Sequence, residues 1–325
     1  MFLEMHNPNL FHGQLPWNKF EGWYFKICDK SGLSFAIIPG ISMDKGDPHA
    51  FVQFLWGKEN KFSYFRLPFE SFKASKNPFT LSIGESIFSF ESVTLKLRSE
   101  TMKVDAELSF SDGVGWNPRA TTHRSMGYYN FLPFMECYSQ VCFIDMKVSG
   151  HITLDGATYF VENGKGYIEK NWGNAFPYSW IWVQSNCFKK SNISLTASIA
   201  HIPFPLGSFR GFLIGLLHDG DFYSFTTMNG AKISIKKGGQ DVFIGAENKK
   251  YFLTLETSSI KENFILCKAP KGGRMIDLVQ ETLTANVKIR LIEKATKRII
   301  VEDTGYNSGI EYGGEQMKIL DQATK

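Results

Sequence analysis

The stretch MKVDAELSF, residues 102–110, alternates apolar and polar side chains with a period of two along its whole length. Successive side chains of a β-strand point to opposite faces, so this alternation predicts a strand with one buried and one solvated face. Residues 93–98 (VTLKLR) and 287–291 (VKIRL) follow the same pattern. No stretch shows a convincing helical period, and we therefore expect strands to dominate the fold.

Turn-forming dipeptides separate many of these alternating stretches. Aspartate or asparagine followed by glycine supplies the positive-φ positions that tight hairpins need, and five such pairs occur, at residues 112–113, 155–156, 163–164, 219–220 and 229–230. Short strands joined by frequent hairpins are typical of antiparallel barrels and sandwiches. The predicted fold class is all-β, with little helix.

The length of 325 residues and a hydrophobic content of 43% favour two domains. The segment 22–28 (GWYFKIC) and the segment 179–186 (SWIWVQSN) are both tryptophan-led strand patterns, and a small-residue-containing apolar strand pattern follows each one. Such an internal echo indicates two copies of one β unit. We predict a boundary near residue 165, with domains at 1–165 and 166–325.

Composition and missing motifs narrow the function classes. The 36 basic and 32 acidic residues are spread along the chain, which gives no indication of nucleic-acid binding. Phosphate-binding loops, dinucleotide fingerprints, nucleophile elbows and zincin helices have no match, and the seven histidines lack ligand spacing, so we expect neither a metal nor a cofactor. The start of the chain does not resemble a secretion signal, and the expected location is cytoplasmic.

Two segments combine acidic groups with tryptophans in otherwise core-like sequence: FEGWYFK at 20–26, and the stretch 167–184 that begins YIEKNWG. Burial beside aromatic rings favours the protonated form of a carboxyl group, which makes Glu21 and Glu169 candidate general acids. Glu136 and Asp145 are weaker candidates by the same logic. The alternative is structural: Glu169 and Lys170 point to opposite faces of a strand, and Glu21 pairs with a lysine on a rim.

These two segments also carry a resemblance to the tocopherol cyclase-like family. Members have an F-E-G-W-Y-F-K block near the start, which residues 20–26 match, and a central Y-x-E-K-N-W-G-x-x-F-P-x-x-W-x-W-x-Q block, which residues 167–184 match at every stated position. Residues 311–314 resemble the family's E-V-G-G ending, with Tyr312 in place of valine. The resemblance spans nearly the whole chain.

The resemblance implies a fold and a reaction. The fold is a pair of lipocalin-like, or calycin-like, β domains, distantly similar to carotenoid hydratase-like proteins. The reaction is protonation of a prenyl double bond in a lipophilic prenylated hydroquinone, followed by capture of the cation by the phenolic oxygen, which closes a chroman-type ring. Aromatic faces can stabilise such a cation, and the reaction needs no redox or metal cofactor.

The same resemblance, combined with strand geometry, assigns candidate roles. Glu169 is the expected proton donor and Glu21 a second acid, while Asn171 and Gln184 are expected to orient the ring oxygens. The remaining expected substrate-binding residues are aromatic side chains of the two matching blocks, namely Trp23, Tyr24, Tyr167, Trp172, Trp180 and Trp182. The alternative is that Trp23, Asn171 and Trp172 are core landmarks of a barrel.

Two other functions stay open at this point. A lipocalin-like carrier would hold a hydrophobic ligand without transforming it, and it would need the apolar cavity but no buried acid. A hydratase or hydrolase would share the fold with a different task. The expected partner is a lipophilic small molecule, with peripheral membrane contact through Phe2 and Leu3 or through the loop 201–207.

Overall fold

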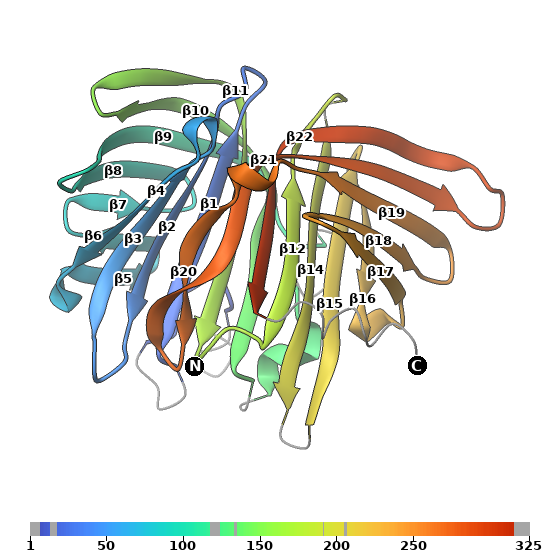
Figure 1. The fold of residues 1–325 in the computed structure, drawn as a ribbon, viewed down its shortest axis with the longest axis horizontal. Coiled ribbons are helices and arrows are strands. Elements are labelled where there is room, and N and C mark those ends of the chain that lie inside the picture. The colour runs from blue at the N-terminus through green and yellow to red at the C-terminus, as the bar shows by residue number, and fades with distance from the viewer. Residues whose placement is uncertain are drawn as a thin grey trace. The chain divides into compact units, whose positions relative to one another are not determined.

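The computed structural model describes residues 7–13, 18–117, 124–132, 135–190, 192–204 and 207–314, and its regular structure is almost entirely β (Figure 1). Its helices are short 3-10 turns, namely η2 (Gly57–Glu59), η3 (Phe69–Ser71), η4 (Gly127–Phe131), η5 (Thr227–Asn229) and η6 (Lys261–Asn263). In this part of the chain, none of them is long and apolar enough to cross a bilayer. The prediction of an all-β protein with little helix is confirmed, whereas Phe2, Leu3 and two residues of the loop 201–207 lie outside the described residues.

The chain forms two compact units. The first contains the described residues of 7–116, 124–176 and 268–277, and the second contains Asn117 and the described residues of 177–267 and 278–314. The predicted boundary near residue 165 falls inside a strand, β11 (Ala157–Gly173), that pairs with other strands of the first unit. A division into domains at 1–165 and 166–325 stays a prediction.

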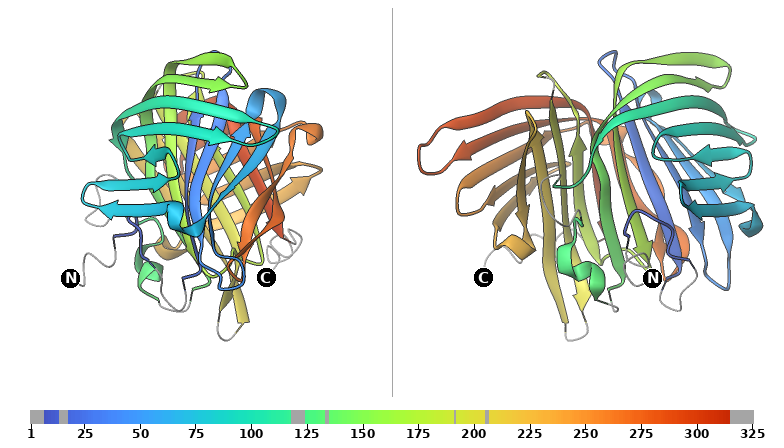
Figure 2. Two further views of the ribbon diagram at one scale, coloured as in Figure 1. Left: turned by 90° about the vertical axis from the view of Figure 1, so that its left-hand side faces the viewer. Right: turned by 180° about the vertical axis from the view of Figure 1, so that it is seen from behind.

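The first unit is built on one antiparallel sheet whose hairpins β5 to β9 curl round (Figure 2). Its inner face carries a core that includes Trp23, Phe25 and Ile168, and the buried positions of residues 104–110 alternate as predicted. In spatial order the strands are β4 (Lys61–Leu67), β3 (His49–Trp56), β2 (Ser34–Ser42), β1 (Phe20–Cys28), β11, β10 (Cys137–Leu154), β9 (Lys103–Val114), β8 (Ser92–Arg98), β7 (Ser86–Phe88), β6 (Phe79–Ile83) and β5 (Phe72–Lys76).

The second unit repeats this plan with its own antiparallel sheet and its own core, which includes Ile181, Ile310 and Tyr312. In spatial order the strands are β16 (Asp221–Thr226), β15 (Gly207–His218), β14 (Ile193–Phe204), β12 (Ser179–Ser185), β22 (Ile299–Gly314), β21 (Arg274–Glu293), β19 (Tyr251–Ser258), β18 (Asp241–Glu247) and β17 (Lys232–Gly238), while β13 (Cys187–Phe188) pairs with β22 and β20 (Ile265–Lys271) pairs with β21.

Candidate active site

The two sequence blocks of the first unit are neighbours in its sheet. Strands β1 and β11 pair in antiparallel register, with Trp23 opposite Lys170 and Tyr24 opposite Glu169. Opposed residues share a face and successive residues alternate between faces. Lys170 therefore lies on the inner face with the core residue Trp23, whereas Glu169 lies on the outer face with Tyr24.

The inner face holds a buried ion pair. The Nζ atom of Lys170 lies 2.7 Å from Oε2 of Glu21, and both side chains are fully buried. The ammonium group also donates to Nδ1 of His12 at 2.7 Å and to the carbonyl oxygen of Leu10. An ammonium group has three protons to donate, so these three acceptors satisfy it.

The carboxylate of Glu21 is satisfied in the same way. It accepts from the backbone N–H groups of His12 at 3.0 Å and Gly13 at 3.1 Å, and from Nδ2 of Asn18 at 2.6 Å. Together with the Lys170 contact, these bonds use the oxygens of a group that has about four lone-pair sites. These hydrogen bonds and the ion pair hold the segment around His12 against strands β1 and β11.

Aromatic rings enclose the lysine. Its Nζ atom lies 4.7 Å from the centroid of the Trp23 ring and 4.6 Å from that of Trp172, which are cation–π distances. The Trp172 ring stacks on His12 at 4.5 Å and on Tyr138 at 5.3 Å. Both predicted binding tryptophans of the first unit thus lie on the opposite face of the sheet from Glu169.

Electrostatics make Glu21 an anion. Burial alone would raise the pKa of the Glu21 carboxyl, but the charge of Lys170 and the hydrogen bond from its ammonium group hold that pKa below its usual value. Burial and the same ammonium charge lower the pKa of His12, which keeps its imidazole neutral. Because Nδ1 of His12 accepts from Lys170, the ring proton resides on Nε2. This arrangement favours a structural role for Glu21 over proton donation.

The outer face presents Glu169 with a different set of partners. This residue is 8% exposed, and its carboxylate accepts hydrogen bonds from the hydroxyl group of Tyr167 at 2.6 Å, from Nδ2 of Asn171 at 2.9 Å and from the hydroxyl group of Ser139 at 3.4 Å. The donors come from β11 itself and from its neighbour β10. The structure therefore brings three predicted residues, Tyr167, Glu169 and Asn171, together on one face.

The two weaker carboxyl candidates differ from each other. Asp145 forms an ion pair with Lys165 at 2.6 Å. Burial raises the pKa of the Glu136 carboxyl, so this group is the natural comparison for any test of Glu169.

The predicted residues of the second unit occupy one face of β12. Trp180, Trp182 and Gln184 alternate with the core residues Ile181 and Val183, and all three are buried. The indole N–H of Trp180 donates to Oε1 of Glu311, and its ring lies where a Cβ atom at Gly313 would stand. Glycine at position 313 is therefore needed for the Trp180 ring to lie against strand β22.

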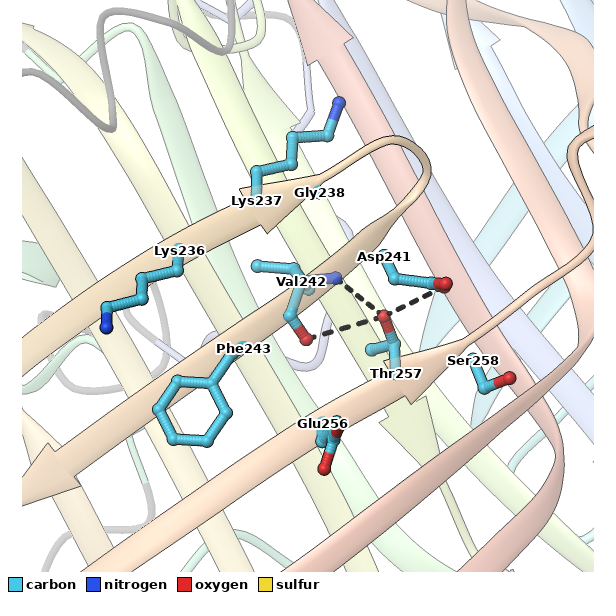
Figure 3. Close-up of a pocket in the computed structure, with 9 residues that line it drawn as sticks. All are labelled: Lys236, Lys237, Gly238, Asp241, Val242, Phe243, Glu256, Thr257 and Ser258. Carbon is cyan, nitrogen blue, oxygen red and sulfur yellow. Dashed lines mark hydrogen bonds between the residues drawn. The ribbon is translucent and has the colours of Figure 1, made fainter.

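A pocket of about 460 Å³ lies beside the β17–β18 turn of the second unit (Figure 3). Its lining includes charged side chains, and its buried hydroxyl group, that of Thr257, already accepts from the backbone N–H of Val242 at 2.8 Å. No predicted site residue lines this pocket, so it does not coincide with either tryptophan block.

Across the described ranges, no cluster of three or more His, Cys, Asp or Glu side chains could hold a metal ion. Sequence reasoning missed His12, Asn18 and Ser139, which contact the predicted carboxylates. None of the three belongs to a sequence motif. Ser139 reaches Glu169 because β10 pairs with β11, and His12 and Asn18 reach Glu21 because the N-terminal segment lies against β1. Glu311 belongs to the stretch 311–314 that resembles the family ending, and its hydrogen bond with Trp180 follows only from the pairing of β12 with β22.

Comparison with known proteins decides the family, because residues 95–314 match the tocopherol cyclase-like family. This chain belongs to that family. It is 28% identical over 218 residues to the probable chloroplastic tocopherol cyclase of Oryza sativa subsp. japonica, and 27% identical over the same length to the chloroplastic tocopherol cyclase of Zea mays. Each match covers 64% of this chain and 46% of the relative, so the chain spans about half the length of the curated relatives it matches.

Solved structures share the fold at low sequence identity. Kievitone hydratase from Nectria haematococca superposes with a TM-score of 0.54 at 12% identity, covering 96% of this chain and 92% of that one. The structure of CghA with Sch210972 gives a TM-score of 0.57 at 8% identity, covering 92% and 89%. The calycin-like architecture that the resemblance implied is confirmed, and at these identities the likeness concerns the fold alone.

Proposed function

We propose that this chain is an enzyme that closes a chroman-type ring on a lipophilic prenylated hydroquinone, with Glu169 as the proton donor. The observation that carries the proposal is that two hydroxyl groups and an amide donate to the carboxyl group of Glu169, a residue that is only 8% exposed. A hydroxyl can donate to a carboxylate or accept from a carboxylic acid. The two hydroxyl groups can therefore hydrogen-bond the carboxyl in both protonation states that an acid catalyst passes through.

The reaction balances without any other reactant. The Glu169 carboxylic acid gives its proton to one carbon of the prenyl double bond, which leaves a tertiary cation and a carboxylate. The phenolic oxygen forms a bond to the cation, and its proton passes to the Glu169 carboxylate. Donors aimed at that carboxylate, above all Tyr167 at 2.6 Å, stabilise the charge that develops in the first step.

Membership of the tocopherol cyclase-like family supports this reaction class, and so do the names of the plant relatives. In the second unit we assign Trp180, Trp182 and Gln184 to ligand binding, because indole faces and a buried amide suit an apolar molecule with a polar end. In the first unit, Trp23 and Trp172 hold Lys170, and this contact favours their reading as core landmarks.

The test is incubation of the purified chain with prenylated hydroquinones, followed by mass-resolved chromatography. An isomeric product identifies a cyclase, a product heavier by one water identifies a hydratase, and saturable binding without any product identifies a carrier. Glu169→Gln should abolish the isomer, since general acids contribute about 10²–10⁴-fold to rate. Glu136→Gln is the matched control and should keep it; loss of product in the control alone would transfer the role to Glu136.

We also propose peripheral membrane contact through the hairpin of β14 and β15, as a route for a lipophilic substrate. Phe204 at the described end of β14 is 37% exposed and packs edge-on against Phe209 at 5.6 Å. Sedimentation with liposomes at low salt tests this contact, and Phe204→Ser should reduce the bound fraction. Equal sedimentation of both proteins would remove this hairpin from the proposal.

A further inference from the structure

One buried side chain of the second unit lacks hydrogen bonds that its chemistry demands. Gln184 is fully buried, and within the described part of the chain neither Oε1 nor Nε2 has a hydrogen-bond partner. The hydroxyl group of Ser194 is also fully buried and has none. Buried polar groups are nearly always paired, so each such exception calls for an explanation.

The two side chains lie close together on the sheet. Gln184 in β12 stands opposite Thr196 in β14, and Ser194 is two residues along β14 on the same face. A diagonal neighbour of this kind is about 7–8 Å away, within reach of a long side chain. Trp180 and Trp182 share this face by the alternation of β12, so unpaired polar atoms and indole rings occur together.

A second buried glutamine has hydrogen-bond partners for both polar atoms of its side-chain amide. In the first unit, Gln140 is 2% exposed, and its Oε1 accepts from the backbone N–H of Ser125 at 3.0 Å. Its Nε2 donates to the carbonyl oxygen of Val141 at 2.9 Å. Gln140 therefore stabilises the folded chain by itself, whereas burial of Gln184 costs free energy until a partner arrives.

We propose that Gln184, with Ser194 beside it, binds the oxygen substituent of a flat ring, as in a phenol, hydroquinone or quinone. A primary amide offers a donor and an acceptor side by side, which matches a hydroxyl group that both donates and accepts. The indole rings of Trp180 and Trp182 supply the apolar surface that the ring itself needs. The inference rests on the proposed function only for the choice of a phenolic ligand.

The first measurement is the thermal stability of the ligand-free protein. Gln184→Met keeps the length of the side chain and removes the unpaired polar atoms, so the melting temperature should rise. Gln140→Met is the matched control, and its melting temperature should fall because Ser125 and Val141 lose a partner. A fall for Gln184→Met as well would show that the amide is already satisfied in the protein, and would overturn the proposal.

The second measurement is binding of 2-isopentylhydroquinone, whose saturated chain cannot be protonated, and of its dimethyl ether, which cannot donate. Wild-type protein should bind the hydroquinone about tenfold more tightly than the dimethyl ether, as expected for one good hydrogen bond in a buried site. Gln184→Met should bind both probes alike, and Ser194→Ala should retain part of the preference.

The outcomes separate this inference from the proposed reaction. Equal binding of the two probes by wild-type protein, or a preference that Gln184→Met retains, overturns the inference even if the chain makes a cyclised product. A preference that vanishes only in Gln184→Met supports it even if no product forms, because neither probe can be turned over.

Discussion

Glu169 and Lys170 are adjacent in sequence and lie on opposite faces of strand β11, and their surroundings differ in kind. Lys170 donates to a carboxylate, an imidazole nitrogen and a carbonyl oxygen, all of which can only accept here. The partners of Glu169 include two hydroxyl groups and an amide. An ammonium ion can only donate, whereas a hydroxyl can reverse its role. In the proposed mechanism, one dipeptide thus combines a residue that stabilises the fold with a residue that gives and takes up a proton.

The largest expected effect comes from the inner face. Lys170→Met leaves the Glu21 carboxylate buried without its counter-ion, and should destabilise the protein by about 3–5 kcal/mol in chemical denaturation. The double variant Glu21→Leu with Lys170→Met should recover part of that loss, because no buried charge remains. If Lys170→Met kept its stability and lost turnover, the assignment of the two faces would have to be exchanged.

The stabilising effect of the Glu21 carboxylate should disappear in acid. The folded pKa of Glu21 lies below the usual 4.5, so its contribution to stability is complete above pH 4.5 and disappears as the pH falls through the folded value. Glu21→Gln should therefore be clearly less stable than wild type at neutral pH, and the gap should close in strong acid. Denaturation of both proteins across this range measures the gap, and a gap that is independent of pH would mean that the Glu21 charge is irrelevant.

Most of the fold could be predicted from the alternation of apolar and polar residues along the strands. Residues 102–110 show the predicted alternation, and the two tryptophan-led blocks are strands of separate sheets. The register between strands could not be predicted, because residues 20–26 and 167–173 are separated by well over a hundred positions. Without that register, Glu21 and Glu169 look alike in sequence, and only the pairing of Trp23 with Lys170 assigns them to opposite faces.

The outer face should show the opposite balance of effects. Tyr167→Phe removes the 2.6 Å hydrogen bond to Glu169 and changes the packed volume little. Hydrogen bonds to charged groups contribute about 1.5–3 kcal/mol, so turnover should fall by about tenfold or more while the melting temperature changes only slightly. If Tyr167→Phe lost as much stability as Lys170→Met and kept its turnover rate, the proposed difference between the two faces of β11 would be wrong.

The smallest expected effect distinguishes an ordered set of donors from a merely polar surrounding. The Ser139 hydroxyl lies 3.4 Å from Oε1 of Glu169, at the limit of a hydrogen bond, whereas Asn171 donates to the same oxygen at 2.9 Å. Ser139→Ala should therefore lower turnover by no more than about twofold, and Asn171→Ala should lower it further, if the strength of each bond sets its share of charge stabilisation. Equal losses in both variants would mean that the outer face acts through its overall polarity. A graded loss, largest for Tyr167 and smallest for Ser139, would locate the developing charge on the Glu169 carboxylate itself.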